Sequence, residues 1–154
     1  MKAGEATFFE IAGCYKRYHC PLSRTIYLGT PDAAYMKAEA AVLEGLENGL
    51  AIAKPGALCG DIAASLRQTL SQHGFDRGDA RCGYPIGLSY PPDWGERTYS
   101  LRPSDDTVLE AGMTFHFMPG LWMDTWGMET TEAVLITPTG NETLANVSRA
   151  TFIK

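Results

Sequence analysis

The chain has 154 residues, which is enough for one domain built around one hydrophobic core. Its composition, 45% hydrophobic and 20% charged, is that of ordinary soluble globular proteins. The net charge of −5 and the lack of any Lys/Arg run argue against a nucleic-acid partner. No apolar run approaches the roughly 18 residues of a membrane span, and the N-terminus lacks the apolar core of a signal peptide, so we expect a cytoplasmic protein.

The first two elements are predicted to be strands. Residues 6–15 are apolar and aromatic around a single acid, Glu10, and residues 22–29 alternate before they stop at Gly29. A polar turn near Lys16 and Arg17 would join the two strands. An acid within an apolar strand is costly to bury without a partner, so Glu10 is a candidate for a functional role.

Two helices are predicted next. Thr30 and Pro31 are typical of a helix start, with Thr30 as the N-cap and Pro31 at the first helical position. This helix should end before Pro55, and a second helix should run from about Gly60 to Gly74. Apolar residues recur every four positions on each: Ala34, Ala38, Val42, Leu46 and Leu50 on the first, and Ile62, Leu66 and Leu70 on the second.

From Gly83 onward the pattern is that of β-structure. The stretches 107–124 and 127–140 hold the long strand candidates, and Ala111-Gly112 and Gly140 mark turns. Two helices among antiparallel strands predict an α+β fold with a curved antiparallel sheet. Two helices are few for so many strands, and the first strand begins almost at residue 1. We therefore expect the chain to be part of a longer protein or to need a partner.

The cysteines do not indicate a metal site. Cys14, Cys20, Cys59 and Cys82 form no Cys-x-x-Cys pair, and their spacing with His19 and His73 fits no zinc-ligand pattern. Buried or half-buried thiols in a reducing compartment are the simpler interpretation.

Five motifs in the sequence, taken in their order along the chain, indicate a family resemblance. They are HCPLSRT at 19–25, KPGALCGDIAASLRQTLSQHG at 54–74, GYPIGL at 83–88, LEAGMTFHFMPG at 109–120 and ETTEAVLITPTG at 129–140. Together they resemble the motifs of the creatinase, prolidase and methionine aminopeptidase family, which has the pita-bread fold. The resemblance implies that residues 1–154 form the C-terminal part of such a catalytic domain, truncated at its N-terminus.

The resemblance also locates the family's metal ligands. The metallopeptidases bind two divalent ions through two aspartates, a histidine and two glutamates, and the matching positions here are Glu10, Pro21, Tyr84, Met118 and Thr131. Hard divalent ions require several converging oxygen ligands. We therefore expect no metal, and no other cofactor is implied. Creatinase sets the family's precedent for metal-free hydrolysis of a C–N bond.

Two longer stretches are more specific. Residues 83–98 read GYPIGLSYPPDWGERT and residues 112–122 read GMTFHFMPGLW. Both are similar to stretches of the ectoine hydrolases within this family. Ectoine is a cyclic amidine that bears a carboxylate. The resemblance thus implies a metal-independent hydrolase of C–N bonds that opens the ectoine ring to an N-acetyl-diaminobutyrate.

Ring opening requires a nucleophile, an acid for the leaving nitrogen, aromatic faces for the cationic ring and an arginine for the carboxylate. Strand alternation places His116 beside Met118 and Glu129 beside Thr131, while Glu132 should face away. The predicted catalytic residues are Glu10, His116, Glu129 and Glu96. The predicted substrate-binding residues are Tyr84, Tyr90, Asp93, Trp94, Trp122 and Arg97, with Arg24 as a second candidate for the carboxylate.

In the working mechanism, Glu129 or Glu10 attacks the amidine carbon or activates water, and His116 carries the proton to the leaving nitrogen. Each candidate also has a structural interpretation: Glu96 could pair with Arg97, Asp93 could form a turn, and the aromatic residues could only pack. Two other functions stay open, namely a metal-dependent Xaa-Pro peptidase and an inactive truncated homologue that binds a small zwitterion. We expect a small-molecule substrate, no membrane partner and a homodimer.

Overall fold

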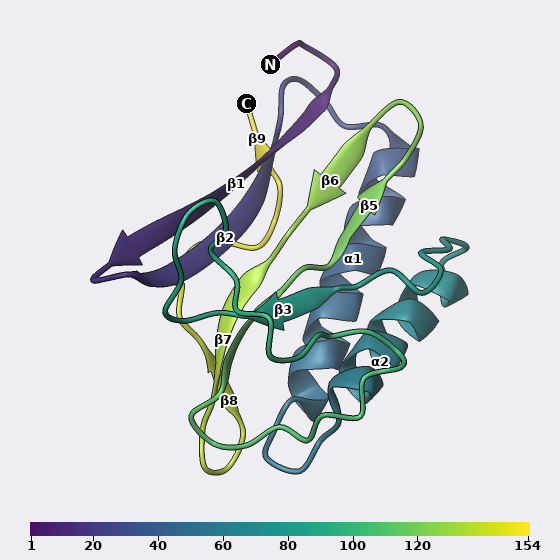
Figure 1. The fold of residues 1–154 in the computed structure, drawn as a ribbon. Coiled ribbons are helices and arrows are strands. Elements are labelled where there is room, and N and C mark those ends of the chain that lie inside the picture. Colours follow the sequence, from purple (N-terminus) through teal and green to yellow (C-terminus); the bar gives the residue numbers. More distant parts are fainter.

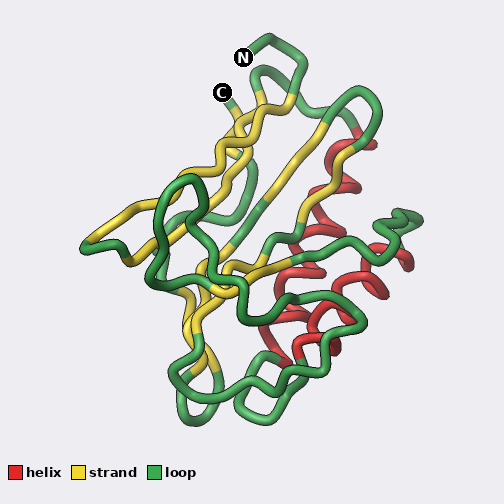
Figure 2. The backbone as a smooth tube through the Cα atoms, viewed as in Figure 1, coloured by secondary structure: helices red, strands yellow, loops and turns green.

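The computed structural model describes residues 1–154 and contains two helices among nine strands (Figures 1 and 2). The helices are α1 (Ala33–Ile52) and α2 (Cys59–Gln72), and neither is long and apolar enough to cross a membrane. The strands are β1 (Ala6–Tyr15), β2 (Tyr18–Tyr27), β3 (Gly83–Pro85), β4 (Thr114–Phe117), β5 (Gly120–Trp122), β6 (Gly127–Glu129), β7 (Glu132–Ile136), β8 (Asn141–Thr143) and β9 (Phe152–Ile153).

The α+β class is confirmed, but the strands form three sheets rather than one. Their orders are β1-β2-β9, β3-β4-β7-β8 and β5-β6. All neighbours are antiparallel except β2 and β9, which run parallel. Through the β2–β9 pairing the C-terminus returns to the neighbourhood of the N-terminus (Figure 1).

The predicted hairpin is confirmed, with a longer second strand than expected. Lys16 and Arg17 have φ of 49° and 70°, the left-handed values that a tight two-residue hairpin turn requires. Pairing therefore continues up to the turn, where Tyr15 faces Tyr18, and β2 starts four residues before the predicted strand. Alternation then places Glu10 opposite Ser23, on the half-buried face of β1.

The predicted start of the first helix was wrong by two residues. Asp32 is the N-cap, because its carboxylate accepts a hydrogen bond of 2.8 Å from the backbone N–H of Tyr35. Pro31 consequently stands outside the helix, and Ala34 is exposed while Tyr35 is buried. The remaining apolar positions of both helices are buried, and α2 ends as predicted just before Gly74, which has φ of +84°.

The two helices pack side by side against one face of the β-structure (Figure 1). The core joins Leu46 of α1 and Leu66 of α2 to Phe115 and Phe117 of β4. Contact between α1 and β4 is close at Gly49, where an added Cβ would lie 2.5 Å from two ring carbons of Phe117. The β1–β2 hairpin projects away from the helices on the other side of the molecule (Figure 2).

The outer surface of this hairpin is apolar and exposed. Ile11, Tyr15 and Tyr18 have 67%, 75% and 64% of their surface accessible. This is the kind of surface that the expected homodimer would bury, and the homodimer itself stays a prediction.

Replacement of Gly49 by alanine should destabilise the protein. Alanine normally stabilises a helix interior relative to glycine by about 1 kcal/mol. Here the methyl group meets the ring of Phe117, and overpacking of this kind costs about 1–3 kcal/mol. Urea denaturation of Gly49→Ala should therefore show a lower free energy of unfolding. The same substitution in a Phe117→Leu background is the matched control, in which alanine should be neutral or stabilising. A gain in stability for Gly49→Ala alone would contradict the packing described.

Candidate active site

A pocket of about 770 Å³ lies where β1, β3, β5 and β6 meet the segments that precede and follow β3. This volume suits a small molecule. The structure brings eight of the predicted site residues to its lining: Glu10, Tyr84, Asp93, Trp94, Glu96, Arg97, Trp122 and Glu129. Met118, at a former ligand position, also lines the pocket as alternation predicted.

Two carboxylates enter the pocket from different strands. Glu10 projects from the middle of β1 and Glu129 from the end of β6, and Glu129 is almost wholly buried. The pKa of Glu129 is raised to about 7, mainly by burial and also by the charge of Glu10, while Ser23 and Arg77 oppose the shift. Burial also raises the pKa of Glu10, but a hydrogen bond from Tyr84 opposes this shift. Near neutral pH, Glu129 is therefore the carboxyl group of the two that holds a proton.

Tyr84 connects three of the predicted residues through its hydroxyl group. The indole N–H of Trp94 donates to this oxygen at 2.6 Å, and Nδ1 of His116 lies 2.9 Å away. Oε1 of Glu10 is 3.4 Å from the same hydroxyl. Burial raises the pKa of Tyr84, so the phenol keeps its proton. A neutral phenol in this position is a hydrogen-bond donor for the Glu10 carboxylate.

His116 does not line the pocket, and its predicted role in proton transfer stays a prediction. Its ring is fully buried behind Tyr84, with Nε2 2.6 Å from Oγ1 of Thr131. Burial lowers the pKa of His116 to about 3, so the imidazole is neutral in the physiological range. The imidazole reaches the pocket from behind, where Nδ1 contacts the Tyr84 hydroxyl and also lies 3.5 Å from Oε1 of Glu10.

One arrangement of protons satisfies this whole chain of contacts. The backbone N–H of Ser23 donates to Oγ1 of Thr131 at 2.7 Å. If Thr131 donates to Nε2 of His116, Nδ1–H donates to Tyr84, and Tyr84 then donates to Glu10. The opposite tautomer of His116 would leave the Thr131 hydroxyl without an acceptor among these groups. The donors thus run from Ser23 towards the Glu10 carboxylate.

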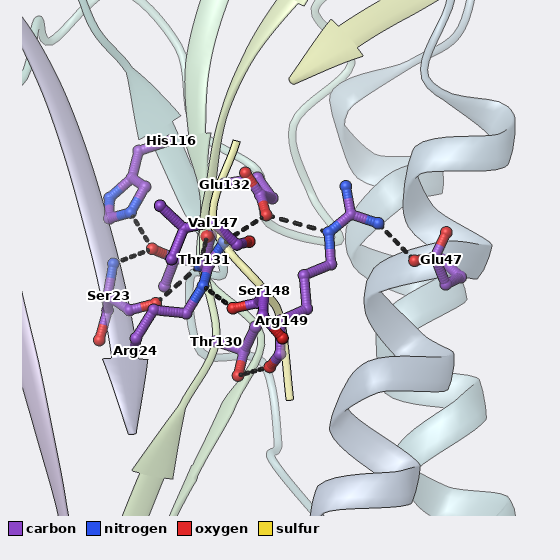
Figure 3. A network of polar contacts seen from close by, with 10 residues as sticks. All are labelled: Ser23, Arg24, Glu47, His116, Thr130, Thr131, Glu132, Val147, Ser148 and Arg149. Carbon is purple, nitrogen blue, oxygen red and sulfur yellow. Dashed lines mark hydrogen bonds and ion pairs between the residues drawn. The ribbon is translucent and has the colours of Figure 1, made fainter. Parts of the chain in front are cut away.

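Next to this series of hydrogen bonds lies a buried ion pair that joins β2 to β7 (Figure 3). Arg24 donates to the carboxylate of Glu132 at 2.7 Å and to the backbone oxygen of Thr131 at 2.5 Å. Glu132 also accepts from Arg149, which pairs in turn with Glu47 of α1. Glu132 therefore faces away from the pocket as predicted. All three side-chain nitrogens of Arg24 donate hydrogen bonds within the protein, so none is free to bind a substrate carboxylate.

The segment after β3 supplies one wall of the pocket. Asp93 accepts from the backbone N–H groups of Trp94 and Gly95, and it pairs with Arg97 at 3.4 Å. Glu96 forms no ion pair with Arg97; one of its carboxylate oxygens instead sits against Gly87.

Tyr90 is not among the residues that line the pocket, and its predicted role in substrate binding stays a prediction. Its ring is 62% exposed and packs against the guanidinium of Arg17, 5.2 Å from the ring centre. This segment is irregular, so strand alternation could not predict that Trp94 lines the pocket and Tyr90 does not.

Sequence reasoning missed two arginines that line the pocket, Arg77 and Arg81. Both lie between α2 and β3, with Arg77 over the ring of Trp122 and Arg81 over the ring of Tyr84. The available signal was a pair of arginines four residues apart, immediately before the segment that carries Tyr84.

The family model for metallopeptidase family M24 matches residues 1–138. The chain belongs to this family. It is 65% identical, over all 154 residues, to a Halomonas elongata protein named ectoine hydrolase, and 25% identical over 97% of its length to a Xaa-Pro dipeptidase from Pyrococcus furiosus. The chain spans 39% and 42% of those two proteins, so it covers about two fifths of these M24 relatives.

Solved structures of M24 enzymes share the fold. The dipeptidase PepE from Mycobacterium ulcerans superposes with a TM-score of 0.91 at 22% identity, covering 99% of this chain and 41% of that one. The X-Pro aminopeptidase from Thermotoga maritima gives a TM-score of 0.90 at 23% identity, covering 99% and 43%. The pita-bread fold expected from the motifs is thereby confirmed.

The M24 family implies a metal centre, and the donor groups of this chain do not fit one. Of the five ligand positions, only Glu10 carries a carboxylate, and Pro21, Tyr84, Met118 and Thr131 fill the others. No three His, Cys, Asp or Glu side chains of residues 1–154 lie close enough together to hold a metal ion. Glu129 adds a second carboxylate beside Glu10, which still leaves fewer oxygen donors than a dinuclear site needs.

Replacement of Glu129 by glutamine should change how stability depends on pH. The native pKa of about 7 lies above the ordinary value of 4.5, so the stabilising contribution of protonated Glu129 is complete below about pH 4.5 and is lost as the pH rises through 7. Glutamine cannot ionise. Glu129→Gln should match the parent near pH 4.5 and exceed its free energy of unfolding by roughly 2–3 kcal/mol at pH 8.

Chemical denaturation across this pH range is the measurement, with Glu142→Gln on the exposed side of β8 as the control that should follow the parent. An unchanged pH dependence for Glu129→Gln would contradict the raised pKa.

Proposed function

We propose that this chain carries the active site of a hydrolase that opens the amidine ring of ectoine without a metal. The observation that carries the proposal is the composition of the pocket, in which the metal-ligand positions are substituted and two carboxylates meet aromatic rings and arginines. The high identity to a protein named ectoine hydrolase supports the choice of substrate.

A cyclic amidine fits these groups chemically. Protonated ectoine carries a delocalised cation, which ionised carboxylates and the faces of Tyr84, Trp94 and Trp122 attract. The amidinium carbon is already electrophilic, so the reaction does not need a Lewis acid. The substrate carboxylate needs a cationic partner, and the pocket offers arginines for that purpose.

Glu10 and Glu129 have different roles in the proposed reaction. Glu10, the more readily ionised, attacks the amidine carbon or takes a proton from the water that attacks it. A C–O bond forms and one C–N bond of the ring breaks. Glu129, which holds a proton near neutral pH, delivers that proton to the leaving nitrogen. With water as the nucleophile, these steps add one water to ectoine and yield an N-acetyl-diaminobutyrate. After direct attack by Glu10, a water molecule then adds to the same carbon and breaks its C–O bond to Glu10, which releases the same product and restores the carboxylate.

Tyr84 and His116 position Glu10 in this scheme. The Tyr84 hydroxyl donates towards Oε1 of Glu10, and His116 with Trp94 holds that hydroxyl in place. We assign His116 a positioning role in this scheme, because its buried ring contacts both Tyr84 and Glu10 and does not line the pocket.

Incubation of the purified protein with ectoine, with and without a chelator, should give the same rate of ring opening. Mass spectrometry of the product should show ectoine plus 18 mass units, the mass of one water molecule. Loss of turnover on chelation, with stoichiometric manganese, zinc or cobalt in the protein and cleavage of Xaa-Pro dipeptides, would instead identify a metal-dependent peptidase. Calorimetric binding of ectoine without turnover would identify a binding protein.

Substitutions in the carboxylate pair should separate catalysis from binding. Glu10→Gln and Glu129→Gln should each lower kcat by at least about 100-fold, since each removes one proton-transfer or nucleophilic step. His116→Ala should lower kcat less, because it acts through Tyr84, and Tyr84→Phe should reproduce much of that loss. Glu142→Gln serves as the control with parental activity. Full activity in both Glu129→Gln and His116→Ala would disprove this assignment.

A further inference from the structure

Three arginines line the pocket, and two of them, Arg77 and Arg81, form no ion pair. Arg77 and Arg81 come from the segment between α2 and β3, whereas the two carboxylates come from β1 and β6. None of the ion pairs within residues 1–154 involves either arginine. Neither guanidinium therefore pairs directly with a carboxylate, although the charge of Glu129 acts on Arg77.

Arg77 is the more enclosed of the two. Its guanidinium stacks on Trp122, 4.7 Å from the ring centre, and donates to the backbone oxygens of Met118 at 2.8 Å and Arg81 at 3.2 Å. Its Nε atom is buried and has no acceptor. Arg77 is half-buried, and a guanidinium partly removed from water without a directly paired anion favours a ligand that completes its environment.

Arg81 is exposed, and its guanidinium is held over the face of Tyr84, 5.0 Å from the ring centre. It forms no hydrogen bond through its side chain, so its planar fork of N–H donors is available to a carboxylate. Tyr84 in turn contacts Glu10. A carboxylate bound by Arg81 would thus lie beside the ring that leads to the proposed nucleophile.

The other arginines considered for this role are committed elsewhere. Arg97 pairs with Asp93, and all the side-chain nitrogens of Arg24 donate to groups within the chain.

We propose that Arg77 and Arg81 form the subsite for the substrate carboxylate, and that they orient the cationic ring towards Glu10 and Glu129. This inference rests on the proposed function and narrows its substrate class to cyclic amidines that carry a carboxylate. Arg81 binds the carboxylate directly, and Arg77 adds positive charge to the same subsite. A neutral group in place of the carboxylate leaves the guanidinium groups unpaired, so the pocket discriminates against such compounds.

The test compares ectoine with ectoine amide, in which a carboxamide replaces the carboxylate. The parent protein should prefer ectoine in kcat/KM by about 10- to 100-fold, the range expected for charge-assisted hydrogen bonds. Arg81→Ala should abolish most of this preference by reducing kcat/KM for ectoine alone. Arg81→Lys should restore part of it, because lysine keeps the charge and loses the fork. Arg102→Ala, an exposed arginine outside the pocket, is the matched control with parental preference.

Arg77→Met tests the second arginine, because methionine keeps apolar contact with Trp122 and removes the charge. Its kcat/KM should also fall for ectoine more than for the amide, and circular dichroism should confirm that the variant is folded. Equal losses on both compounds in Arg81→Ala, or an unchanged preference, would overturn the subsite while leaving the proposed function in place.

If the parent protein does not open ectoine, the proposed function fails and the subsite is decided by calorimetry. The parent should still bind ectoine more tightly than ectoine amide, and Arg81→Ala should bind the two equally. Binding that does not distinguish the two compounds in the parent would overturn the subsite as well.

Discussion

The buried ion pair between Arg24 and Glu132 is the interaction on which the arrangement of the site depends. It fixes β2 against β7, and Arg149 extends it to α1 through Glu47 (Figure 3). Removal of one partner from a buried pair typically costs about 3–5 kcal/mol, because the other charge stays buried without compensation. The ion pair also helps to position Thr131, because the same guanidinium donates to the backbone oxygen of Thr131 as well as to that of Ser23 on its own strand.

A series of hydrogen bonds connects the region of this ion pair to the pocket. Thr131 meets the backbone of Ser23 on one side and His116 on the other, and His116 holds Tyr84 beside Glu10. By the resemblance of the motifs, Thr131, Tyr84 and Glu10 stand at positions where the M24 metallopeptidases carry metal ligands. Here threonine and tyrosine occupy two of them, and hydrogen bonds among neutral groups hold the site together in place of coordination bonds. A pocket supported in this way keeps its carboxylates available to a cationic ligand.

Much of the site followed from alternation along regular strands. Met118, Glu129 and Glu10 face the pocket and Glu132 faces away, because side chains of successive strand residues point to opposite faces. Alternation also placed His116 on the pocket side of β4, but it could not show that Tyr84 lies between His116 and the pocket. Alternation gives the face of the sheet and does not say which other side chains cover a residue. Irregular segments offered no periodicity, so Tyr90 was placed in the pocket and Arg77 and Arg81 were left out.

The sequence by itself determined the α+β class, the hairpin turn at Lys16 and Arg17, the two helices and the substitution of the family's metal ligands. These features are local, since each depends on propensity, spacing or the identity of single residues. Only the tertiary structure decided that Tyr84 stands between His116 and the pocket and that Arg24 forms an ion pair with Glu132. It also decided that Arg77 and Arg81 form no ion pair. Burial and pairing are properties of groups distant in the chain, and they appear only when the fold brings those groups together.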